Sequence, residues 1–180
     1  MRTLQTQVGN ELVWTRIKGF PRSIELRSGD ESFAVLTRRR GTHFIGETAE
    51  GRWSFKRTGC LHPRVAIRAG DSEQDFASVA MSWKGCGTLE LPAARRFRWT
   101  QVSFWRQRYA FRDEHSREVL QTSGGSFGKQ RLSIHPEARG VEELPLLALL
   151  SAYLLRLAAD DAAASIAASA AVSVAITAGS

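Results

Sequence analysis

Residues 144–157 read LPLLALLSAYLLRL, and leucines occupy every side of the helix that this stretch predicts. Pro145 suits the first helical turn, and the negative charges of the two glutamates before Leu144 stabilise the positive, N-terminal end of the helix dipole. A helix that is apolar all round must be enclosed by protein or by lipid. Its first 12 residues are uncharged and span about 18 Å of helix, against about 30 Å for the hydrocarbon core of a bilayer. We therefore expect a helix at about residues 143–159 that is enclosed by protein.

The chain before this helix alternates apolar and polar residues in short blocks, as half-buried strands do. Arg52-Trp53-Ser54-Phe55-Lys56 and Arg64-Val65-Ala66-Ile67-Arg68 are examples. Turn-forming residues separate the blocks, and no strand-helix alternation appears, which excludes doubly wound folds and (β/α)8 barrels. The blocks lie at about residues 11–17, 22–27, 31–37, 42–47, 51–57, 64–69, 75–83, 86–91, 95–102, 104–112, 117–122 and 130–135.

These blocks and the helix combine into one architecture. A sheet of about twelve antiparallel strands can close into a barrel, which removes its edges. A barrel wider than about eight strands has a lumen that wall side chains alone do not fill, so we expect the leucine helix inside it. The predicted fold is mainly β: a closed antiparallel barrel of about twelve strands around one hydrophobic C-terminal helix. The predicted boundaries are an extension at 1–9, the barrel and helix at 10–160, and an Ala/Ser-rich tail at 161–180. The uncharged stretch 162–179 has few large side chains, which makes it a weak candidate for membrane insertion, and we expect a helical extension followed by a frayed tail.

Over about residues 10–158, the chain resembles the tubby C-terminal-like superfamily, which includes tubby proteins, phospholipid scramblases and LURP-one-related proteins. The resemblance depends on the strand count, the aromatic residues of 97–99 and 105–111, and the closing helix 144–157. It implies a twelve-stranded barrel around a hydrophobic helix and, from the phosphoinositide-binding tubby domains, peripheral binding of anionic lipids. The chain lacks the cysteine cluster, the Pro-rich extension and the acidic Ca²⁺ loop of scramblases, which argues against scramblase activity.

The composition is that of a folded protein with an excess of positive charge. The 180 residues are 43% hydrophobic and 24% charged, which excludes disordered, collagen-like and disulfide-dense classes. Residues 1–140 hold 24 basic and 14 acidic residues, whereas 141–180 hold one basic and four acidic residues. Of the 25 basic residues 21 are arginine, the side chain best suited to bidentate phosphate recognition, although genome composition also explains this bias.

No motif predicts catalysis. The two cysteines and four histidines, with Cys60 and His62 as the one local pair, do not form a zinc pattern. The Gly-rich loop at 123–128 lacks the features of a phosphate loop and is best interpreted as a hairpin loop, with weak anion binding by its backbone amides beside Lys129 as the alternative. The paired carboxylates lie in predicted turns. We therefore predict a protein that is not an enzyme, with no catalytic residue, cofactor or metal. Residues 1–9 lack the apolar stretch of a secretory signal, so the expected location is cytoplasmic, and peripheral to the membrane if the protein binds lipid.

The arginines provide the functional hypothesis. The predicted lipid- or anion-binding residues crowd one turn or lie on the polar faces of two consecutive strands: Arg38, Arg39, Arg40, Arg96, Arg98, Arg106 and Arg108. A basic surface of this kind binds anionic headgroups or nucleic-acid phosphates. The opposing interpretation is a solvated barrel exterior, partly paired with Glu114 and Glu118. The aromatics at 99, 105, 109 and 111 alternate with these arginines, and we expect them in the core.

Three functions follow from these observations. The first hypothesis is a non-enzymatic tubby-like barrel that binds anionic membrane lipids peripherally. The second, less favoured, is a basic barrel that binds nucleic acid, which a sequence pI of about 10.2 allows. The third is a barrel that binds a small ligand or a protein partner.

Overall fold

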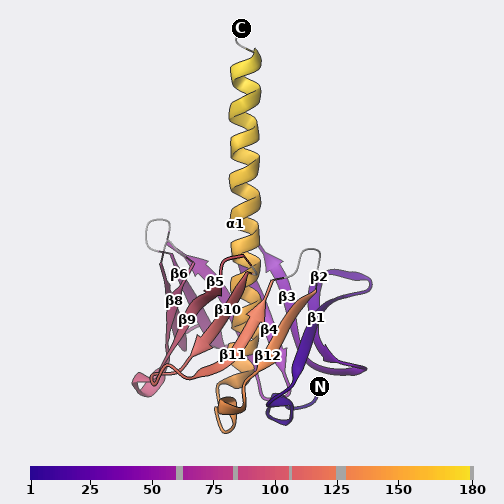
Figure 1. Cartoon of the computed structure of the whole chain (residues 1–180), viewed down its shortest axis with the longest axis vertical. Helices are drawn as coiled ribbons and strands as arrows, with labels where there is room; N and C mark the ends of the chain where they lie inside the picture. Colours follow the sequence, from indigo (N-terminus) through magenta and orange to yellow (C-terminus); the bar gives the residue numbers. More distant parts are fainter. Residues whose placement is uncertain (60–62, 83–84, 106, 125–128, 179–180) are drawn as a thin grey trace.

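The barrel wall consists of twelve antiparallel strands, and β1 pairs with β12 to close the ring (Figure 1). The structure is a computed structural model that describes residues 1–59, 63–82, 85–105, 107–124 and 129–178. The strands are β1 (Glu11–Ile17), β2 (Phe20–Ser28), β3 (Glu31–Arg40), β4 (His43–Thr48), β5 (Arg52–Thr58), β6 (Arg64–Ala69), β7 (Ala77–Met81), β8 (Gly87–Glu90), β9 (Arg96–Ser103), β10 (Arg108–Arg112), β11 (Glu118–Ser123) and β12 (Gln130–Ile134). The predicted fold class is confirmed, since each predicted block overlaps one strand. The strand order, which the sequence pattern left open, is sequential.

Helix α1 (Leu144–Ala178) runs through the lumen and projects from one end of the barrel (Figure 1). The side chains from Leu144 to Leu155 are buried, and those from Asp161 to Ser169 are exposed. The helix continues well beyond the enclosed segment predicted at 143–159, as a helical extension. It continues because the tail is rich in alanine, the best helix former, and holds no Gly or Pro before Gly179.

Close packing sets the position of α1 in the lumen. A Cβ atom on Gly46 would lie 2.8 Å from both Leu149 Cδ atoms, so glycine is the residue that lets β4 approach the helix. The Tyr153 ring stacks on Phe55 and meets Phe44 edge to face, with centroids 5.3 and 5.2 Å away. Its hydroxyl donates a hydrogen bond of 3.0 Å to the Thr42 carbonyl, and burial raises the pKa of this phenol. The buried Tyr153 hydroxyl is thus satisfied, as is that of Ser151, which donates a hydrogen bond of 2.7 Å to the Ala148 carbonyl.

The two ends of the barrel differ. At one end, which we call the closed end, η1 (Leu4–Gln7) and η3 (Pro136–Ala138) lie by the start of α1, with Leu4 fully buried. There the Gln5 amide donates a hydrogen bond of 2.7 Å to the Val141 carbonyl. At the other, the helix-exit end, α1 leaves the barrel beside the hairpin that joins β3 to β4.

The predicted aromatic core of β9 and β10 is confirmed with one exception. Trp99 and Phe111 are buried, and Tyr109 is partly buried and stacked on Trp99 at a centroid distance of 5.1 Å. The prediction for Trp105 was wrong, because this side chain is 91% exposed. It lies in the turn between β9 and β10, where the alternation of inward and outward residues no longer applies.

Candidate functional site

A basic cavity of about 420 Å³, which we call the arginine pocket, opens at the helix-exit end. Its lining residues come from β2, β3, the turn after β3, β4 and α1: Arg22, Ile24, Leu36, Arg38, Arg39, Arg40, Gly41, Phe44 and Arg156. Five of these residues are arginines, and none is acidic. The lining therefore combines a strong positive charge with an apolar floor from three aliphatic and aromatic side chains.

A register shift in β3 brings three consecutive arginines to this pocket. In a regular strand, successive side chains point to opposite faces of the sheet. Between β3 and β4, Arg38 pairs with Phe44 whereas Arg40 pairs with His43, so the ladder is irregular around Arg39. An extra residue of this kind bends the strand and redirects its side chains. The predicted cluster at 38–40 is thus brought together, with the last two side chains exposed.

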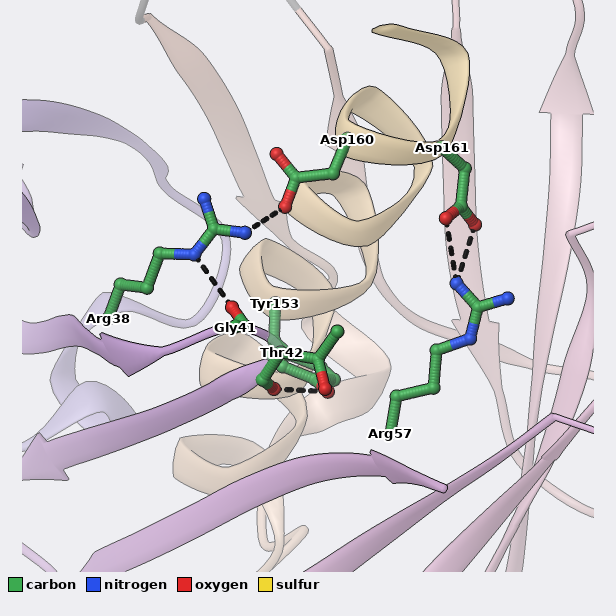
Figure 2. Close-up of polar contacts among 7 residues, drawn as sticks. All are labelled: Arg38, Gly41, Thr42, Arg57, Tyr153, Asp160 and Asp161. Atoms are coloured by element: carbon green, nitrogen blue, oxygen red, sulfur yellow. Dashed lines mark hydrogen bonds and ion pairs between the residues drawn. The ribbon is translucent and has the colours of Figure 1, made fainter. Parts of the chain in front are cut away.

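Arg38 is held in place by several contacts (Figure 2). Its Nε donates a hydrogen bond of 2.9 Å to the Gly41 carbonyl. Its guanidinium lies 5.2 Å from the centre of the Phe44 ring. The guanidinium also forms an ion pair with Asp160 of α1. On the neighbouring wall, Arg57 of β5 contacts both carboxylate oxygens of Asp161 at 2.8 Å. These two ion pairs join the helix to the barrel rim.

Arg156 extends the basic cluster from the helix itself. Burial lowers the pKa of its guanidinium, and the nearby positive charges of Arg16 and Arg38 lower it further, against the opposing effect of Asp160. Like charges this close repel one another, so an anion that entered the pocket would relieve the repulsion. The electrostatics of the pocket therefore favour a negatively charged ligand.

Sequence reasoning missed Arg22 and Arg156. Residues two apart in a strand lie on the same face of the sheet. Arg22 is two residues before the inward-facing Ile24 of β2, and Arg38 is two residues after the inward-facing Leu36 of β3. The alternation therefore indicated that Arg22, like Arg38, lies on the inner face near the rim. In the sequence, Arg156 is the first charged residue after the uncharged run 144–155. Its proximity to β3 depends on the position of the helix in the lumen, which no local pattern gives.

The other predicted arginines lie on the barrel wall, away from the pocket lining. Arg96 and Arg98 are exposed on β9, where Arg96 lies 3.9 Å from Glu90. Arg98 is paired in register with Arg112 of β10, which contacts Glu118 at 3.7 Å, and Arg108 begins β10. The predictions for Arg106, Cys60, His62 and residues 125–128 fall outside the described residues.

A second, smaller cavity of about 170 Å³ lies between α1 and wall residues of β5, β6, β7, β9 and β10. Its lining is mostly apolar and includes Val65, Met81, Trp99 and Leu154. Arg57 and Asp161 also line it, so their ion pair borders this cavity.

Charge is segregated along the barrel axis. The connections between strands at the helix-exit end contain no Asp or Glu, whereas those at the closed end, with the segment before α1, contain ten. Closed-end carboxylates pair with arginines at N–O distances of 2.6 to 3.3 Å, as in Arg2–Glu31, Arg52–Asp71, Arg68–Asp75, Arg95–Glu143 and Arg117–Asp113. Among the residues that the structure describes, Arg16, Arg22, Arg39, Arg40 and Arg64 at the helix-exit end form no ion pair, and neither do Arg98 and Arg139 toward the closed end. More of the unpaired arginines thus lie at the helix-exit end.

In the described part of the chain, no three side chains of His, Cys, Asp or Glu gather to hold a metal ion, and no helix segment has the length and hydropathy to cross a membrane. Comparisons with family models, curated proteins and solved structures found no match to this chain.

Proposed function

We propose that this protein is a non-enzymatic, tubby-like barrel that binds anionic membrane lipids peripherally through the arginine pocket. The observation that carries the proposal is the lining of that pocket, where five arginines and no carboxylate surround one cavity. Guanidinium groups match the geometry of phosphate oxygens and bind them through paired hydrogen bonds. A phosphate-bearing headgroup supplies the negative charge that the crowded cations around Arg156 favour.

The shape of the site supports a lipid headgroup over a nucleic acid. Binding to a nucleic-acid strand uses a basic groove that follows the backbone, with exposed aromatics on which bases stack. Here the arginines line a cavity at the barrel mouth and not a groove. The aromatics of β9 and β10 that alternate with arginines pack inward, and the exposed Phe104 and Trp105 lie in a turn that does not line this cavity. The apolar floor of Leu36 and Phe44 is suited to the less polar part of a headgroup.

Flotation on vesicles tests this function. We expect the full chain to float with vesicles of phosphatidylcholine and phosphatidylserine, but not with phosphatidylcholine alone, because the pocket needs negative charge. Excess single-stranded polynucleotide should leave most of the protein on the anionic vesicles. Complete displacement by polynucleotide would favour the nucleic-acid hypothesis instead. Absence of flotation on both vesicle types would contradict the proposal and leave the apolar cavity of about 170 Å³ as the remaining candidate site.

Asp160→Asn is expected to strengthen binding to anionic vesicles by about fivefold. Asp160 is the carboxylate that contacts a pocket arginine, and one charge near a lipid surface is worth about 1 kcal/mol. Vesicle titration of both proteins would measure the ratio. Asp161→Asn is the matched control, because it changes the net charge equally but frees Arg57, which does not line the pocket. An equal gain in both variants would show that net charge alone, and not the pocket, sets the affinity.

A further inference from the structure

Large apolar side chains are exposed on the hairpins of the helix-exit end. Phe104 and Trp105 form the turn after β9 and are 72% and 91% exposed, and Phe20 at the start of β2 is 65% exposed. The rings of Phe104 and Trp105 meet edge to face with centroids 5.8 Å apart, so they form one apolar tip. Aromatic side chains on an otherwise polar rim indicate an interaction surface, and they are enriched where proteins meet the headgroup region of a bilayer.

Three further features at this end fit the same partner. The arginine pocket opens here, and the strand connections hold no acidic residue. The projecting part of α1 carries no charged residue from 162 to 178, and Ile166 on it is 72% exposed. The ten carboxylates of the closed end lie at the opposite pole of the barrel. An anionic surface attracts the first pole more strongly than the second, where arginines pair with the carboxylates, and this difference orients the molecule as it approaches.

We propose that the barrel docks on an anionic bilayer with its helix-exit end facing the lipid. Phe20, Phe104 and Trp105 then insert among the headgroups, and the uncharged part of α1 enters the bilayer from one side. The closed end faces the water. This inference rests on the proposed lipid binding and adds to it an orientation and an inserted surface.

Fluorescence quenching by brominated lipids tests the orientation. All proteins carry Trp83→Phe, and the vesicles contain phosphatidylserine and phosphatidylcholine with brominated acyl chains. Trp105 is then the highly exposed reporter, since Trp14 and Trp99 are buried and Trp53 is partly buried. A second protein carries Trp105→Phe and Phe76→Trp, which moves the reporter to the closed end, where Phe76 is 40% exposed before β7. Flotation of the same samples measures the bound fraction.

The expected result is that both proteins float and that brominated lipid quenches only the one with Trp105. The quenched fraction should fall several-fold when the reporter moves to position 76. Flotation without quenching of Trp105, or equal quenching at both positions, would overturn the inferred orientation and leave lipid binding intact. Failure of both proteins to float would instead overturn the proposed function, and the orientation with it.

Discussion

Replacing Leu149 with Ala is expected to lower the free energy of unfolding by about 2–5 kcal/mol. Leu149 is fully buried at the centre of the lumen, where its methyl groups fill the space left by Gly46 of β4. The ring of strands prevents the wall from collapsing onto the smaller side chain, so a cavity remains. Urea denaturation followed by circular dichroism would measure the loss. Ile166→Ala on the exposed part of the same helix is the control, with an expected change within about 0.5 kcal/mol.

A double-mutant cycle with Gly46→Ala makes this prediction specific to the position of the helix. Alone, Gly46→Ala should also destabilise the protein, because its methyl group would lie 2.8 Å from the Leu149 side chain. Combined with Leu149→Ala, the new methyl group enters the vacated space. The double variant should therefore lose less stability than the sum of the two single variants. Strict additivity would mean that β4 and the helix do not meet at this position.

The fold could be predicted from the sequence because two periodicities are strong. The alternation of apolar and polar residues in short blocks predicts strands. A leucine helix without a polar face must be surrounded by protein along its whole apolar length. Closing the sheet around the helix satisfies both requirements. The sequential strand order needed the structure, since alternation identifies strands but not their partners.

The candidate site could be predicted only in part. Arg38 to Arg40 were found as a run of charge, but the irregular pairing around Arg39 that gathers them depends on the register with β4. The prediction that Trp105 lies in the core assumed that the alternation of β9, in which Trp99 faces inward, continues to residue 105. The strand ends at Ser103 and the chain reverses in a turn, so the alternation stops before Trp105. The residue that local reasoning misplaced is the one that suggests the docking surface. Arg156 lines the pocket because of where the helix sits in the lumen, and that position depends on the packing of the whole barrel.

The combined replacement of Arg22, Arg39 and Arg40 by Gln is expected to weaken binding to anionic vesicles by about 100-fold. Each basic side chain near an anionic surface contributes about 1 kcal/mol, and about 1.4 kcal/mol changes an affinity tenfold. These three side chains are exposed and form no ion pair among the residues described, so their loss leaves no buried charge behind. The variant should accordingly unfold at nearly the same urea concentration as the original protein.

The matched control changes three arginines outside the pocket to Gln: Arg68, Arg96 and Arg98. Arg68 and Arg96 already face Asp75 and Glu90, and Arg96 and Arg98 belong to the predicted patch on β9. Both variants have the same net charge, so they differ in where the charge was removed. We expect the control to retain most of the affinity, within about fivefold of the original protein.

The most direct measurement is therefore a titration of both triple variants with phosphatidylserine vesicles at a fixed salt concentration. The arginine pocket predicts a dissociation constant that rises by about 100-fold for the variant at positions 22, 39 and 40, and by no more than about fivefold for the control at positions 68, 96 and 98. An equal rise in both variants, or a larger rise for the control, would contradict lipid binding through the pocket.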